Sequence, residues 1–193
     1  MVRFLFDKIS WIFMIKTLKN IVIITVISLF LTGCKKDHII SDKQTILFQF
    51  EYVNYAWGYQ HNGIIINNAG NILTYSNPDG WNFPDNDLIL DESQVTENIS
   101  KCMLNSKRIP KDELQKYSNY IKNIASSKVT ALKNVAADAG SSEFICYQFS
   151  ENTKTYKGYL IKMEGDFTCE NLNFYSKKVV AWIKDIDIHL PEN

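Results

Sequence analysis

The chain has 193 residues, 46% of them apolar and 22% charged, with 21 basic and 21 acidic residues in balance. This length suits one domain with a hydrophobic core of useful size. A balanced chain without a block of basic residues argues against nucleic-acid binding, so no nucleic-acid partner is expected.

The N-terminal segment carries the most specific pattern in the chain. Lys16 and Lys19 precede an apolar run at residues 21–31, and the run leads into Leu31-Thr32-Gly33-Cys34. A basic segment, a short apolar run and small residues are the parts of a secretory signal peptide. Eleven residues are too few for a helix that spans a bilayer, which needs roughly 20.

Leu31-Thr32-Gly33-Cys34 resembles the lipobox of bacterial lipoproteins. The resemblance implies cleavage before Cys34, lipid on that cysteine, and a membrane partner reached through the lipid. Position 35 is Lys rather than Asp. The sequence therefore lacks the pattern that retains lipoproteins in the inner membrane, and this favours the outer membrane. Lys35-Lys36-Asp37 is similar to the surface-export signal of Bacteroidota lipoproteins, and both the cell surface and the periplasmic face stay open. The alternative is a plain membrane anchor in which Cys34 is incidental, and translation starts at either Met1 or Met14.

These boundaries predict a signal peptide at residues 1–33, a lipidated polar tether at 34–44 and a single domain at 45–193. Removal of residues 1–33 takes 4 basic and 1 acidic residues from the 21 of each, which leaves a net charge of −3.

The first part of the domain reads as β-structure. Residues 45–51 alternate, with Ile46, Phe48, Phe50 and Tyr52 on one face, as in a half-buried strand. The alternation changes phase at Tyr52-Val53, which predicts a bulge there. Residues 63–66 and 72–75 form a hairpin around the Asn- and Gly-rich turn at 67–71.

The middle of the domain reads as two helices after a polar loop at 77–87. Asp91 and Gln94 fit a capping box, and the apolar spacing that follows predicts a helix continuing to Lys107-Arg108. Pro110 suits the first turn of a second helix that ends near Ser126-Ser127.

The last third predicts a hairpin from strands 144–149 and 156–163, then a helix capped by Asn171 or Asn173. The complete pattern predicts an α+β fold, with a single antiparallel sheet of about four or five strands and about three helices packed on one face. The run 54–60, with Gly63 and the Gly70-Asn71 turn, is similar to uncharacterised bacterial envelope proteins. That resemblance implies no activity.

Aromatic residues are the candidate ligand contacts. Tyr52, Tyr55, Trp57 and Tyr59 form either a sugar-stacking platform or part of the core, and the core interpretation is favoured. Trp81 and Phe83 lie in the polar loop. Two alternatives stay open for them: an exposed contact with a ligand, or packing back onto the core. Trp57, Trp81 and Phe83 are therefore the residues proposed to touch a ligand.

Other chemistry finds little support in the sequence. Cys102, Cys146 and Cys169 allow at most one disulfide between two of them, and the sequence does not choose the pair. No catalytic motif, metal-ligand spacing or cofactor motif is present, so no cofactor and no metal are expected. Carboxylates at 143, 164, 166 and 170 leave a small acidic-site hydrolase as a remote alternative.

The sequence therefore predicts a lipid-anchored envelope protein whose domain binds a protein or glycan partner without catalysing a reaction. The alternatives are a surface glycan-binding module and, less favoured, a hydrolase.

Overall fold

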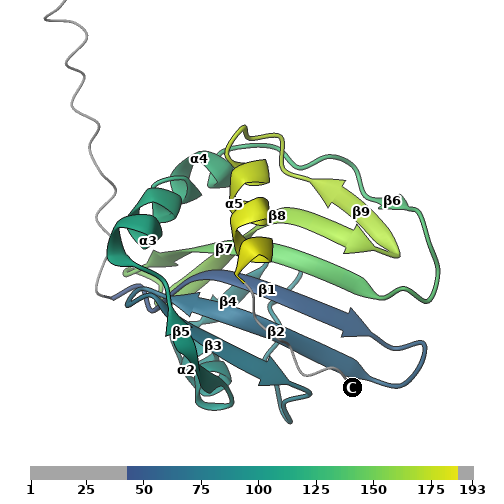
Figure 1. The fold of residues 1–193 in the computed structure, drawn as a ribbon, viewed down its shortest axis with the longest axis horizontal. Helices are drawn as coiled ribbons and strands as arrows, with labels where there is room; N and C mark the ends of the chain where they lie inside the picture. The colour runs from purple at the N-terminus through teal and green to yellow at the C-terminus, as the bar shows by residue number, and fades with distance from the viewer. Residues whose placement is uncertain (1–42, 187–193) are drawn as a thin grey trace, which may run out of the picture. The chain divides into compact units, whose positions relative to one another are not determined.

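Three antiparallel strands at the start of the domain follow from the apolar alternation and the turn residues. The computed structural model describes residues 43–186, which belong to one compact unit spanning His38–Asn193 (Figure 1). Strands β1 (Ile46–Asn54), β2 (Gln60–Asn67) and β3 (Asn71–Ser76) pair in sequence. The Asn67 side-chain oxygen accepts hydrogen bonds from the backbone amides of Ala69 and Asn71, which stabilises the β2–β3 turn. The predicted hairpin is confirmed.

The predicted bulge at Tyr52-Val53 is wrong. The β1–β2 pairing runs without interruption from Phe48 to Asn54, and its only irregularity within the described strands lies between Ile46 and Phe48. The apparent change of phase arises because the chain leaves β1 at Asn54, so the aromatic residues that follow belong to the loop before β2.

The sheet is larger than predicted. It has nine strands in the order β5-β3-β2-β1-β7-β8-β9-β6, and β4 also pairs with β8. All pairings between these strands are antiparallel, and the remaining strands are β4 (Ile89–Asp91), β5 (Met103–Arg108), β6 (Lys133–Asn134), β7 (Ser141–Ser150), β8 (Thr155–Gly165) and β9 (Phe167–Glu170). The expectation of four or five strands is wrong, because the short strands β4, β5, β6 and β9 carry no apolar alternation of their own and form by pairing at the sheet margins.

The first helix begins as predicted and ends early. Asp91 caps α2 (Glu92–Ser100) in a capping box with Gln94. The predicted continuation to Arg108 is wrong, because the backbone from Met103 onward forms β5 on the free edge of β3. An unpaired strand edge satisfies those backbone groups as well as another helical turn does.

The later helices also differ in detail from the prediction. The single helix expected after Pro110 is two, α3 (Lys111–Ser118) and α4 (Ile121–Ala125). The last helix, α5 (Ser176–Asp185), has Tyr175 at its N-cap instead of Asn171 or Asn173. Asn171 instead accepts a hydrogen bond from the Ser176 hydroxyl, at 3.0 Å.

Helices cover both faces of the sheet, which corrects the prediction that they pack on one face. Apolar residues of α3, α4 and α5 pack on one face against strand residues that include Phe48 and Phe144. Val95 of α2 and Leu90 of β4 pack on the other face, around Tyr75 and Tyr147. Sheets with two covered faces bury both sets of alternating side chains in their central strands.

Both hydrophobic clusters lie inside the unit that begins at His38, so we expect this unit to fold without the preceding residues. Gln44, assigned to the tether from sequence, is buried and donates a hydrogen bond to the Tyr147 carbonyl oxygen at 2.8 Å. The predicted signal peptide and Cys34 lie outside the described residues. Within residues 43–186, no helix has the length and apolar character to span a membrane.

Candidate functional site

Polar side chains are buried along the face of β1 that α2 and the loop before it cover. Gln49 and Glu51 alternate with Phe48 and Phe50, and both polar residues are less than one-tenth exposed. A charged or amide side chain is rarely buried unless it is hydrogen-bonded. Their burial therefore points to a network built around them.

The network joins three strands through Gln49. Its side-chain oxygen accepts a hydrogen bond from the Tyr147 hydroxyl at 2.6 Å, and its nitrogen donates to the Tyr75 hydroxyl at 3.0 Å. The same nitrogen lies 3.2 Å from Glu51 Oε2. Burial is the main reason that the pKa values of both tyrosines lie well above their ordinary value, and the charge of Glu51 raises them further. Both hydroxyls therefore stay protonated and hold Gln49 in one orientation.

His61 of β2 completes the network from the other side of Glu51. Its Nε2 lies 3.1 Å from Glu51 Oε2, while its Nδ1 is buried and has no hydrogen-bond partner among residues 43–186. The tautomer with the proton on Nε2 fits this arrangement, because a carboxylate accepts and the bare Nδ1 then needs no acceptor. The rings of Tyr75, Trp81 and Phe83 surround the imidazole at centroid distances of 5.0, 5.3 and 5.0 Å.

Gly63 makes room for this arrangement. It lies opposite Glu51 in the β1–β2 pairing and opposite Tyr75 in the β2–β3 pairing. A Cβ at Gly63 would overlap the Tyr75 hydroxyl and the Phe50 carbonyl oxygen. Glycine is therefore required here for the close approach of a side chain to the backbone.

A pocket of about 590 Å³ opens beside this network, where β1 ends and β7 begins. Four carboxyl-bearing residues line it: Glu51, Asp138, Glu143 and Asp166. Three aromatic residues, Tyr55, Phe83 and Phe167, also line it, and the lining contains no lysine, arginine or histidine. The volume lies within the range of small-molecule sites.

Glu143 is a pocket acid whose pKa is raised. Burial, and after it the charge of Glu51, raises the pKa of Glu143 to about 7. The two residues are directly opposite each other in the β1–β7 pairing, where like charges repel. Near neutral pH the pocket therefore holds two facing carboxyl groups with no cation among the residues that line it.

The far wall of the pocket is positioned by backbone interactions. Asp166 accepts a hydrogen bond from the Ala139 amide at 2.8 Å, and its own amide donates to the Gly140 carbonyl oxygen at 2.7 Å. Gly140 has φ +70°, and a Cβ there would approach the Val53 carbonyl oxygen to 2.7 Å. This glycine lets the chain enter β7 close against the end of β1.

The aromatic run before β2 is exposed, so the favoured core interpretation is wrong for three of its four residues. Tyr55 is 72% and Trp57 78% exposed, and Tyr59 is nearly half exposed. The rings of Tyr55 and Tyr59 pack on each other at 5.4 Å. Isolated apolar side chains on a surface are ordinary, whereas a group of large rings beside a pocket marks an interaction site.

The structure separates the three predicted ligand contacts. Phe83 lines the pocket, whereas Trp81 and Trp57 are not among the lining residues. Trp81 stacks on Tyr75, with the ring centroids 4.3 Å apart. The thiols of Cys102, Cys146 and Cys169 are free, and burial raises the pKa of each, to about 12 for Cys102. The disulfide that the sequence allowed is therefore not formed among these three cysteines, and Cys169 lies in strand β9.

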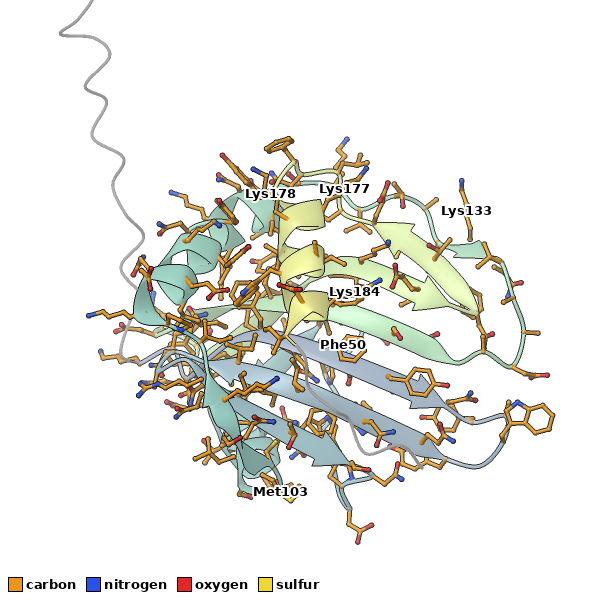
Figure 2. All side chains as sticks on the ribbon, in the orientation of Figure 1. Phe50, Met103, Lys133, Lys177, Lys178 and Lys184 are labelled. Atoms are coloured by element: carbon orange, nitrogen blue, oxygen red, sulfur yellow. The ribbon has the colours of Figure 1, made fainter. Side chains whose placement is uncertain are left out.

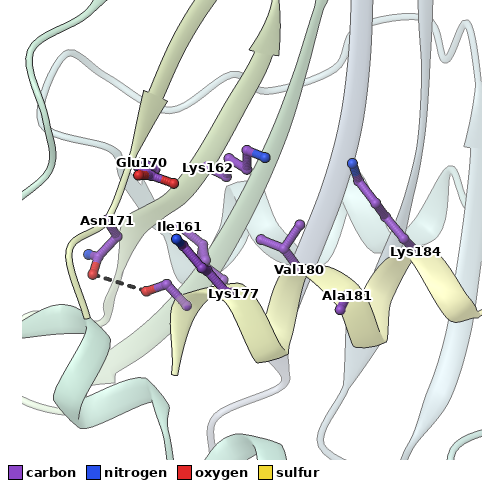
Figure 3. Close-up of a pocket in the computed structure, with 9 residues that line it drawn as sticks. Ile161, Lys162, Glu170, Asn171, Lys177, Val180, Ala181 and Lys184 are labelled. Carbon is purple, nitrogen blue, oxygen red and sulfur yellow. Dashed lines mark hydrogen bonds between the residues drawn. The ribbon is translucent and has the colours of Figure 1, made fainter. Parts of the chain in front are cut away.

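A second hollow, of about 350 Å³, lies between α5 and strands β8 and β9 (Figure 3). Lys177 and Lys184 of α5 face Lys162 and Glu170 of the strands across it. Lys162 and Lys184 both form ion pairs with Glu164, at 2.5 and 2.6 Å. Much of its positive charge is therefore already neutralised, which makes it a weaker candidate than the acidic pocket.

Sequence reasoning missed Gln49, Glu51 and His61, and considered Glu143 only as one of several carboxylates of a remote hydrolase alternative. The signal was the strict alternation of Gln and Glu with Phe in 48–51, which resembles a strand with one wet face. Only the cover supplied by α2, β4 and the loop that carries Trp81 makes that polar face internal. No family model, curated protein or solved structure matches this chain. The site itself therefore carries the functional argument.

Proposed function

We propose that this protein is a lipid-anchored envelope protein whose domain binds an organic cation in the acidic pocket. The ligand class is an ammonium or guanidinium group carried on an apolar body. The observation that carries the proposal is the pocket lining, which has four carboxyl groups, three aromatic rings and no basic side chain.

Electrostatics favours a cation over other ligands. The raised pKa of Glu143 reflects the cost of ionising it in a buried position opposite Glu51. A bound cation offsets that cost by pairing with both carboxylates. The same carboxylates would repel an anionic ligand, and no basic side chain among the lining residues would offset that repulsion.

The aromatic walls favour an organic cation over a bare ion. Tyr55, Phe83 and Phe167 present ring surfaces beside the carboxyl groups. Cations attract the faces of aromatic rings, and this attraction strengthens as water is excluded. Among the described residues, no group of three His, Cys, Asp or Glu side chains is arranged to hold a metal ion.

The lipid anchor is supported by sequence alone. Cys34 follows Leu31-Thr32-Gly33 after the short apolar run. Two or more acyl chains hold a protein firmly on a membrane. Growth of an expressing bacterium with labelled palmitate tests it, and we expect label in the wild-type chain and none in Cys34→Ala.

Calorimetric titration of residues 38–193 with spermidine and with choline tests the pocket. We expect binding that is about tenfold tighter at pH 8 than at pH 6, because Glu143 changes from mostly protonated to mostly ionised between them. Glu143→Gln should weaken binding at pH 8 and remove its pH dependence. Glu92→Gln, an exposed acid at the start of α2, is the matched control and should bind as the wild type does. Equal affinity of all three proteins, or no binding of either probe, would contradict the proposal.

A carbohydrate is the second candidate, favoured by the exposed rings of Tyr55 and Trp57. Neutral oligosaccharides serve as the parallel probes. If the protein binds these oligosaccharides, and the binding is lost in Trp57→Ala and kept in Glu143→Gln, the glycan alternative would replace the organic cation. Cleavage of the same oligosaccharides that is lost in Glu143→Gln would identify a hydrolase, since an acid with a pKa near neutrality suits proton donation.

A further inference from the structure

Lysines gather on one border of the domain, where two lysine-bearing segments meet and Glu170 contacts Thr130 between them. The segments 119–135 and 171–184 contain no Asp or Glu. They carry six exposed lysines, of which Lys184 pairs with Glu164. We call the other five the lysine edge: Lys122, Lys128, Lys133, Lys177 and Lys178. None of the five forms an ion pair within the described part of the chain. A chain with balanced overall charge therefore has a strongly positive border.

Backbone and side-chain contacts hold the two segments side by side. The Leu172 amide donates to the Lys128 carbonyl oxygen at 2.9 Å, and Lys133 pairs with Thr168 where β6 meets β9. The rings of Tyr120 and Tyr175 stack at 4.1 Å. Figure 2 shows Lys133, Lys177 and Lys178 along the same border, near β6 and the start of α5. Residues more than 40 positions apart in sequence thus form one surface.

Large apolar side chains are exposed among these lysines. Phe174 is 73% and Leu172 64% exposed, and Leu132 and Val135 are more than half exposed. Lys178 Nζ lies 4.7 Å from the centre of the Phe174 ring. Apolar groups with lysines around them are the pattern of surfaces that bind at the boundary between lipid headgroups and acyl chains.

We propose that the lysine edge docks on the surface of an anionic lipid bilayer. Each lysine near such a surface is attracted to the lipid headgroups, and the apolar side chains enter the boundary region beneath them. The exposed Phe174 and Leu172 distinguish this occupant from a soluble polyanion, which would contact the lysines and leave the apolar groups in water. A second copy of the chain fits poorly, because a two-fold interface would place the same lysines against each other.

This inference is independent of the ligand in the acidic pocket and of lipid on Cys34. The unit 38–193 lacks Cys34, so any membrane binding it shows comes from its own surface. The hollow beside α5 adds little, since Lys162 and Lys184 are paired with Glu164.

Vesicle sedimentation with residues 38–193 tests the proposal. The probes are phosphatidylcholine vesicles with and without roughly one-third phosphatidylglycerol. We expect binding to the anionic vesicles alone, and weaker binding at higher salt. The double variant Lys177→Gln/Lys178→Gln should weaken it at least tenfold, since each lysine contributes roughly fivefold. The control Lys111→Gln/Lys116→Gln removes two exposed lysines from α3 and should leave it nearly unchanged.

Phe174→Ser separates a bilayer from a polyanion. We expect it to weaken vesicle binding several-fold and to leave any binding of heparin unchanged. Circular dichroism confirms that each variant is folded, as is expected for exposed positions. Equal binding to both kinds of vesicle, no binding to either, or vesicle binding that Phe174→Ser leaves intact would overturn the proposal.

Discussion

The acidic pocket and the lysine edge use charge in opposite ways. Glu51 is buried and its carboxylate is held by Gln49 and His61, while Glu143 faces it in a site that burial makes unfavourable for a second charge. The five lysines of the lysine edge are exposed and have no ion-pair partner among the described residues. Substitutions in the pocket should therefore change both stability and binding, whereas substitutions at the lysine edge should change binding alone.

Gly63→Ala should have the largest effect on stability. The added methyl group overlaps the Tyr75 hydroxyl and the Phe50 carbonyl oxygen, so the β1–β3 region must shift or Tyr75 must leave Gln49. We expect a loss of about 3 kcal/mol in the free energy of unfolding, as for other overpacked core sites. Urea denaturation measures it, and a loss below about 0.5 kcal/mol would contradict the crowding around Gly63.

Glu143 should make the domain less stable as pH rises. Its pKa is about 7 in the folded protein and 4.5 for the free side chain, so the folded state holds the proton more tightly. The stability that this proton contributes is complete below pH 4.5 and is lost as pH rises through 7. The loss between pH 5.5 and 8 should be about 2 kcal/mol at most.

Glu143→Gln removes the titrating group and should flatten this part of the profile. Thermal unfolding across the pH range checks it in both proteins. Identical pH profiles for the wild type and the variant would show that Glu143 does not change its protonation within this pH range on unfolding.

Tyr147→Phe should cost about 1–2 kcal/mol of stability, because it leaves the buried Gln49 oxygen without its donor. Tyr52→Phe makes the same chemical change at the partly exposed rim, where the hydroxyl donates to the Ala139 carbonyl oxygen at 3.2 Å and accepts from Asn54 Nδ2 at 2.9 Å. Water can reach this rim and Asn54 Nδ2 keeps the Asp138 carbonyl oxygen as an acceptor, so a loss below about 1 kcal/mol is expected there. Chemical denaturation compares them, and equal losses would argue against a buried network.

Lys177→Gln/Lys178→Gln should change stability least, by no more than about 0.5 kcal/mol, because both side chains are exposed and neither forms an ion pair with residues 43–186. Thermal unfolding of the double variant checks this. A large loss would mean that these lysines support the fold, and the contrast with the pocket would fail.

Local signals in the sequence were sufficient for several elements. The alternation in 45–51, the turn around Gly70 and the Asp91-Gln94 pair each depend on neighbours within a few residues, and the structure has the corresponding strand, hairpin and cap. Phe83 lines the pocket, and its predicted contact with a ligand stays a prediction. Short-range patterns of this kind survive in the fold because little else competes with them.

Elements that depend on distant partners were not predictable in the same way. Met103–Arg108 has helical apolar spacing at its start, yet it forms β5 because the edge of β3 is free. Glu51 and Glu143 meet only through the pairing of β1 with β7, about 90 residues apart. The lysine edge likewise depends on contacts between two segments, each of which contains only scattered lysines.

The sequence by itself determined the strands at the start of the domain, the turn around Gly70 and the Asp91 cap, and its likeness to a lipobox at residues 31–34 stays a prediction. The tertiary structure decided the number of strands, the cover on both faces, the burial of Glu51 and His61, and the gathering of the lysines. The physical reason is that a period of two shows which side chains share a face of a strand. It does not show whether that face meets water or another layer of the protein.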